Sequence, residues 1–88
     1  MRIKNGFMLR EVADSYVVVA VGKRSSEFNG MVSLNETGAF LWKAMEKDIM
    51  KEELVQALLD TYEVSKEQAV DDVDKFIAMI TENGFAKE

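Results

Sequence analysis

Apolar positions in the first half of the chain follow the period of β-strands. The stretch 16–21 is apolar throughout and rich in β-branched residues, which is typical of an interior strand. The stretch 7–12 alternates loosely and is separated from it by the turn signal Ala13-Asp14-Ser15. Within 31–34, Val32 and Leu34 share one face of a third strand. We therefore predict a meander of strands at 7–12, 16–21 and 31–34, with the last strand at an edge.

The unbroken apolar run at 16–21 implies that both faces of the central strand are covered. Helices are expected to cover one face. The other face is open to three occupants: Met8, Trp42, or a second copy of the chain. The polar stretch 22–30 ends in Asn-Gly and is predicted to be a loop between the second and third strands.

The second half of the chain follows the helical period instead. Asn35 is placed to cap a helix at 36–47, whose stripe repeats at Gly38, Leu41, Trp42 and Met45. Glycine is unfavourable so early in a helix, and we expect another backbone to pass close to Gly38. A second helix is predicted at 51–62, with Met50 in the cap position as a weak start.

The third helix, predicted at 66–83, has signals at both ends. Ser65 and Gln68 have the spacing of a capping box, in which each side chain bonds the backbone N–H of the other residue. Gly84 suits the left-handed position after the helix, with Phe85 packing back on Ile80 as in a Schellman cap. Three strands followed by three helices predict one α+β domain over residues 1–88, with a winged-helix-like arrangement.

Composition narrows the range of functions. The chain has 88 residues, 48% of them hydrophobic, and neither Cys nor His. Thiolate chemistry is therefore excluded, and the commonest general base and metal ligand are missing. The first residues do not continue into a signal peptide, and no apolar run approaches the about 20 residues of a membrane span, so a cytoplasmic protein is expected. The net charge of −5 disfavours nucleic acid as a partner.

The segment Asn35-Glu36-Thr37-Gly38-Ala39-Phe40-Leu41-Trp42, placed directly after an apolar strand, resembles the signature of the PqqD family. Further landmarks follow in the family's order at Phe7 to Val21, Asn29-Gly30, Asp72-Val73 with Phe76-Ile77, and Ile80 with Gly84-Phe85. Members of this family are small recognition elements that bind the leader of a ribosomally made precursor peptide. The resemblance implies a non-catalytic adaptor that presents a leader to a modifying enzyme, often a radical SAM protein. Pyrroloquinoline quinone (PQQ) biosynthesis is the best-known such pathway, and nothing in the sequence selects it.

An exposed edge strand is able to accept an extended peptide by main-chain pairing, whatever the family. The resemblance implies that the leader pairs antiparallel with the third strand and touches the third helix. The predicted contact residues are Phe28, Met31, Val32, Ser33, Leu34, Asp72, Lys75, Phe76 and Met79. Ser33 is the most informative, because a small polar residue on an edge leaves room for an incoming chain. Val32, Leu34 and Phe76 are better suited to the core than to peptide contact. Trp42 is expected in the core or in dimer packing.

Three other functions compete with peptide binding as interpretations of this sequence. A winged-helix DNA reader should gather basic residues on its recognition helix, but the third helix carries Glu67, Asp71, Asp72, Asp74 and Glu82 against Lys66 and Lys75. Catalysis lacks its usual residues, and a metal site built on Asp71 and Asp74 has little support; no cofactor is expected. A homodimeric module, in which the edge strand pairs with a second copy, is the alternative left open.

Overall fold

The fold is an antiparallel sheet followed by a set of helices, as the sequence predicts. The computed structural model describes residues 1–22 and 31–87. The elements in chain order are β1 (Arg2–Ile3), β2 (Phe7–Val12), β3 (Ser15–Ala20), β4 (Val32–Leu34), α1 (Glu36–Ala44), α2 (Lys51–Thr61), α3 (Lys66–Glu82) and β5 (Ala86–Lys87). Strands β2, β3 and β4 form a three-stranded sheet in that order, so the predicted α+β class and meander are confirmed. The predicted loop at 22–30 lies almost wholly outside the described residues.

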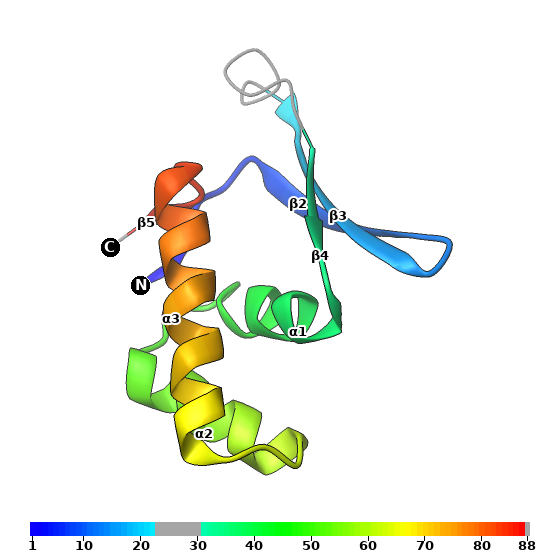
Figure 1. Ribbon diagram of the computed structural model, residues 1–88. Helices are drawn as coiled ribbons and strands as arrows, with labels where there is room; N and C mark the ends of the chain where they lie inside the picture. Colours follow the sequence, from blue (N-terminus) through cyan, green and yellow to red (C-terminus); the bar gives the residue numbers. More distant parts are fainter. Residues whose placement is uncertain (23–30, 88) are drawn as a thin grey trace.

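The two ends of the chain pair with each other, which the sequence analysis did not foresee. β1 and β5 form a second, two-stranded antiparallel sheet, with Ile3 opposite Ala86. The N–H of Ile3 also donates to the carbonyl oxygen of Met45 at 2.8 Å, directly after α1. The predicted extension of α1 to Lys47 is therefore wrong, because the chain turns after Ala44 and offers the Met45 carbonyl to β1. Figure 1 shows β5 and the N-terminus beside the upper part of α3.

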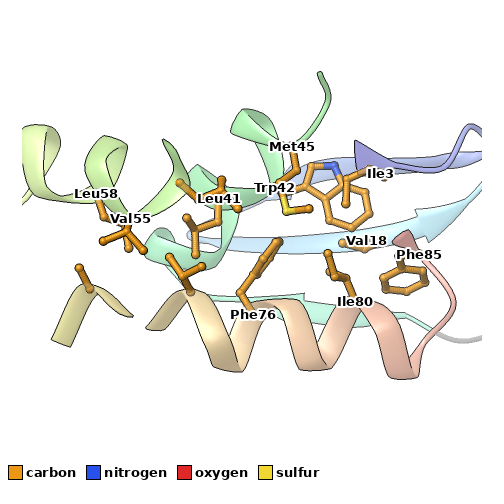
Figure 2. Close-up of a cluster of buried hydrophobic side chains, with 13 residues drawn as sticks. Ile3, Val18, Leu41, Trp42, Met45, Val55, Leu58, Phe76, Ile80 and Phe85 are labelled. Carbon is orange, nitrogen blue, oxygen red and sulfur yellow. The ribbon is translucent and has the colours of Figure 1, made fainter. Parts of the chain in front are cut away.

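The hydrophobic core lies among α1, α2 and α3 and reaches one face of the sheet. Its largest fully buried side chains include Trp42, Phe85, Leu41 and Met45, with Val18 as the sheet's contribution. The Trp42 and Phe85 rings meet edge to face, with centroids 5.7 Å apart. Figure 2 shows Phe76 and Ile80 directed from α3 into the same cluster. The prediction that Trp42 belongs to the core is confirmed.

One face of the central strand is covered by the core, whereas the other is only partly covered within residues 1–22 and 31–87. Cover by a second copy of the chain stays a prediction. Val18 is fully buried, but its neighbours Val17 and Val19 are only half-buried, and Met8 opposite Val19 is exposed. The hairpin β2–β3 extends away from the helices (Figure 1). One face of the apolar strand β3 therefore packs against the core. The described residues of this chain leave the other face without a packing partner.

Local hydrogen bonds form at the N-terminal ends of α1 and α3, and one of them differs from expectation. The Asn35 side chain accepts the Gly38 N–H at 2.7 Å, which confirms the cap. A Cβ on Gly38 would lie 3.2 Å from the Asn35 Oδ1 and 3.3 Å from the Leu34 Cβ, so side chains, and not a passing backbone, account for this glycine. Ser65 accepts the Gln68 N–H, but the Gln68 side chain donates to Asp72 at 2.8 Å instead of completing a capping box.

The second helix begins without a side-chain cap from Met50, as its sequence suggested. The carboxylate of Glu53 compensates by accepting the Met50 N–H at 3.0 Å. A carboxylate in the first turn also interacts favourably with the helix dipole.

The Schellman cap after α3 is present as predicted. Gly84 has a φ of 73°, its N–H donates to the Thr81 carbonyl oxygen, and the Phe85 N–H donates to the Ile80 carbonyl oxygen at 2.8 Å. The cap delivers Phe85 to a fully buried position against Trp42 and Phe7. One glycine conformation thus connects the end of α3 to the core.

Gly84→Ala is expected to lower the free energy of unfolding by about 1 kcal/mol, because alanine is strained at positive φ. A Cβ here meets no atom within 4 Å, so backbone strain is the whole effect. Gly84→Asn should recover part of the loss, since asparagine tolerates this conformation better. Urea denaturation followed by circular dichroism measures both variants. Equal stability of Gly84→Ala and wild type would contradict the assigned cap.

Candidate peptide-binding groove

β4 and β2 are the two edge strands of the three-stranded sheet, and a groove lies beside β4. The alternation of hydrogen-bonded and non-hydrogen-bonded pairs shows which backbone groups of β4 are available. The Val21 N–H donates to the Gly6 carbonyl oxygen at 2.8 Å, one rung beyond the β2–β3 ladder. Hydrogen-bonded rungs recur at every second residue of an antiparallel pair, so Val17 bonds toward β2 whereas Tyr16 and Val18 bond toward β4.

Tyr16 and Val18 pair with Leu34 and Val32 respectively, and Ser33 lies between these two rungs. The backbone N–H and C=O of Ser33 therefore point away from the sheet. Within residues 1–22 and 31–87, the outer side of β4 pairs with no strand. Ser33 thus offers one donor and one acceptor to an incoming extended chain.

A groove of about 280 Å³ runs beside this edge, between β4, the first turns of α1 and the middle of α3. Its apolar residues are Leu34, Leu41 and Phe76, which also belong to the core or pack against it. Gly38 keeps the α1 wall low, because any side chain there would press on Leu34 and Asn35. The residues that line the groove are Ser33, Leu34, Asn35, Thr37, Gly38, Leu41, Asp72, Lys75 and Phe76.

Two opposite charges from α3 lie on the rim of the groove. The Lys75 amino group is 2.9 Å from a carboxylate oxygen of Asp71, one turn earlier on the helix. This hydrogen bond and the charge of Asp71, with a smaller contribution from the charge of Asp72, raise the pKa of Lys75 above its usual value. Lys75 is therefore a permanent cation at neutral pH. Asp72 is half-exposed and accepts a hydrogen bond from Gln68 at 2.8 Å.

The structure brings five of the nine predicted contact residues together on the groove: Ser33, Leu34, Asp72, Lys75 and Phe76. Val32 and Met79 are half-buried and pack against the core. Met31 precedes β4 and has 71% of its surface exposed. Phe28 lies outside the described residues. Whether any of these residues contacts a peptide stays a prediction.

Four groove residues were missed by the sequence analysis, namely Asn35, Thr37, Gly38 and Leu41. All four lie on or directly before α1. The signal was present in the sequence, because β4 runs into α1 without a linker and so places the first turns of that helix beside the edge. Leu41 belongs to the core and also lines the groove, so one helical stripe serves both.

Other kinds of site have little support in the part of the chain that the structure describes. No group of three or more acidic side chains there is arranged to hold a metal ion. None of the described helices is both long and apolar enough to cross a bilayer.

Comparisons with known proteins agree with this geometry. The family model for coenzyme PQQ synthesis protein D (PqqD) matches residues 15–86, from β3 to β5. No curated protein matches the sequence. Among solved structures, TbiB1 in complex with the TbiA(beta) leader peptide is similar with a TM-score of 0.75 and 19% identity, over 97% of this chain and 93% of that one. Lasso peptide synthetase B1 complexed with the leader peptide has a TM-score of 0.75 and 21% identity, over 99% of this chain and 96% of that one. At these identities the likeness shows a shared fold.

Proposed function

This chain belongs to the PqqD family, and we propose that it is a peptide-binding adaptor that holds the leader of a ribosomally made precursor. The observation that supports this function best is the free β4 edge, where Ser33 directs both backbone groups outward beside the groove. Two proteins of similar fold are described as complexes with a leader peptide. The proposal assigns the same kind of ligand to this chain.

Strand addition explains how such a site binds peptides with modest sequence demand. In a leader segment that runs antiparallel to β4, a carbonyl oxygen accepts from the Ser33 N–H and an N–H donates to the Ser33 carbonyl oxygen. Main-chain bonding of this kind supplies affinity. Its side chains alternate between the two faces of the extended sheet. Those opposite Val32 and Leu34 point to the helix side, and the one opposite Ser33 points to the other side.

Selectivity comes from the groove and its rim. A leader side chain opposite Leu34 meets the apolar surface of Leu34, Leu41 and Phe76. Lys75 is placed to pair with an acidic leader residue, and Asp72 with a basic one. Val32, Met31 and Met79 extend the proposed contact surface along β4 and α3. Phe28 completes the proposed set from outside the described residues.

The adaptor itself performs no chemistry in this proposal. Its task is to present the bound precursor to a separate modifying enzyme, for which a radical SAM protein is the candidate class. The product of the pathway is left open, and the family's association with coenzyme PQQ does not decide it. An adaptor of this kind works by raising the local concentration of the precursor at the enzyme.

The proposal is tested by titrating the isotopically labelled protein with the leader segment of a candidate precursor peptide chosen from the neighbouring genes. We expect chemical-shift changes at micromolar peptide, largest at Met31 and Ser33 on the edge and at Lys75 and Phe76 on α3. A matched control is a scrambled peptide of the same composition. Shifts that depend only on protein concentration would show instead that β4 pairs with a second copy of the chain. Saturable shifts confined to other residues would contradict the site.

A further inference from the structure

The sheet has a second surface that the proposed leader site does not use. Side chains alternate along each strand, so Met8, Arg10 and Val12 on β2 lie on the face opposite Phe7 and Leu9. Register places Val17 and Val19 of β3 and Ser33 of β4 on that same face. Met31 precedes β4 with the same alternation. Ser15 lies opposite Val12 on this face as well. We call this set the outer face: Met8, Arg10, Val12, Ser15, Val17, Val19, Met31 and Ser33.

The outer face is apolar and lies away from the core. Phe7, Leu9, Val18 and Val32, on the inner face, belong to the core or pack against it, whereas no apolar residue of the outer face does. The exposed fractions are 45% for Met8, 57% for Val12 and 71% for Met31. Three of the four large exposed hydrophobic residues in the described chain therefore gather on this one face. An apolar patch of this kind on a small domain marks an interaction surface.

The charge of the outer face indicates which partner fits it. Arg10 is its single ionisable residue, and it is exposed. Among residues 1–22 and 31–87, no carboxylate forms an ion pair with Arg10. A second copy would bring an identical face that carries an arginine and no carboxylate. Complementarity therefore favours a different protein that presents an apolar surface with an acidic residue opposite Arg10.

The outer face is continuous with the proposed leader edge. Ser33 offers its backbone to the leader while its side chain lies on the outer face, next in alternation to Met31. The leader residue opposite Ser33 would therefore add its own side chain to this face. A protein docked there contacts the adaptor and the bound leader together.

We propose that the outer face is the docking surface for the peptide-modifying enzyme, whose matching surface is apolar with a carboxylate facing Arg10. This inference rests on the proposed function, because it takes the edge of β4 as the leader site. Methionine and arginine are enriched in protein interfaces, and both are exposed here. Because the leader completes the surface, leader and enzyme should each raise the affinity of the adaptor for the other by the same factor.

Two variants of the full chain, Arg10→Glu and Met8→Glu, test the docking surface against a candidate radical SAM enzyme chosen from the neighbouring genes. Binding of the enzyme, measured by biolayer interferometry with the leader at saturation, should weaken at least about tenfold in each variant. Leader affinity, measured separately by fluorescence anisotropy, should stay within about twofold of wild type, because neither residue touches the edge or the groove. Met50→Glu is the matched control, since Met50 is 65% exposed but lies at the start of α2.

Unchanged enzyme binding in folded Arg10→Glu and Met8→Glu proteins would overturn the assignment of the outer face. Equal loss in Met50→Glu would overturn it as well, because any added carboxylate would then suffice. Analytical ultracentrifugation of the chain alone tests whether a second copy covers the outer face instead. A homodimer that dissociates in the Arg10→Glu variant would show that it does. Failure of the wild-type protein to bind the leader would count against the proposed function. Binding of the enzyme to the adaptor is therefore also measured without leader, so that the two proposals are tested separately.

Discussion

Ser33→Pro is expected to fold and to lose at least about tenfold in affinity for the leader peptide. Proline removes the N–H that Ser33 directs outward, and its ring occupies the space that the incoming carbonyl needs. A leader carbonyl left without a partner at a desolvated edge costs about 1–3 kcal/mol, and about 1.4 kcal/mol corresponds to tenfold. Isothermal titration calorimetry with the candidate leader peptide measures the change.

The fold should tolerate this proline because no hydrogen bond within the sheet uses the Ser33 N–H. We expect the free energy of unfolding to fall by about 1 kcal/mol, from the restricted backbone angle alone. Val18→Pro is the contrasting variant in the central strand, where a rung toward β4 and a fully buried side chain are both disturbed. The free energy of unfolding of Val18→Pro should fall by at least about 3 kcal/mol.

Ser33→Ala separates the backbone from the side chain at the same position. Alanine keeps the N–H, so leader affinity should stay within about threefold of wild type. A folded Ser33→Pro protein with unchanged affinity would rule out main-chain pairing at β4. A strong loss in Ser33→Ala would instead assign the affinity to the hydroxyl group.

Trp42→Ala is expected to lower the free energy of unfolding by about 3–5 kcal/mol. Trp42 is 1% exposed and meets the Phe85 ring edge to face, and Phe85 in turn packs on Phe7. Removing the indole therefore opens a cavity between α1, the end of α3 and the strand segments. The total free energy of unfolding of a small domain is about 5–15 kcal/mol, so a substantial fraction of the variant should be unfolded at 37 °C.

Guanidinium denaturation followed by far-ultraviolet circular dichroism measures this loss, since the variant has no tryptophan fluorescence. Trp42→Phe keeps an aromatic contact with Phe85 and should lose less than half as much free energy. A loss below about 1 kcal/mol in Trp42→Ala would show that the cluster around Phe85 does not depend on the indole. Leader affinity of the folded fraction should be unchanged, because Trp42 does not line the groove.

Local sequence signals were sufficient to predict most of the helices and their caps. Asn35, Ser65 and Gly84 act within one helical turn of their own positions, so a short stretch of sequence contains everything that their hydrogen bonds need. The predicted bond from the Gln68 side chain to the Ser65 N–H does not form, because Asp72, one turn later, accepts a hydrogen bond from that side chain. Propensity describes which bonds a residue is able to make, but neighbouring groups decide which one forms.

The pairing of β1 with β5 and the shortened end of α1 were beyond reach of the sequence pattern. Two-residue strands have no periodicity, and their hydrogen bonds join residues at opposite ends of the chain. The Met45 carbonyl ends α1 by accepting the Ile3 N–H, which is far away in sequence. Such contacts are decided by which segments the packed core brings together.

The sequence by itself determined the order of the three main strands and the three helices, the caps at Asn35, Ser65 and Gly84, and the single polar residue at the centre of the edge strand. Period and capping are local properties. Only the tertiary structure decided that Ser33 faces outward, that α1 supplies part of the groove, and that one face of the sheet remains apolar and uncovered. These features depend on strand register and on how α1 and α3 pack beside the edge. Both result from contacts between residues that are distant along the chain.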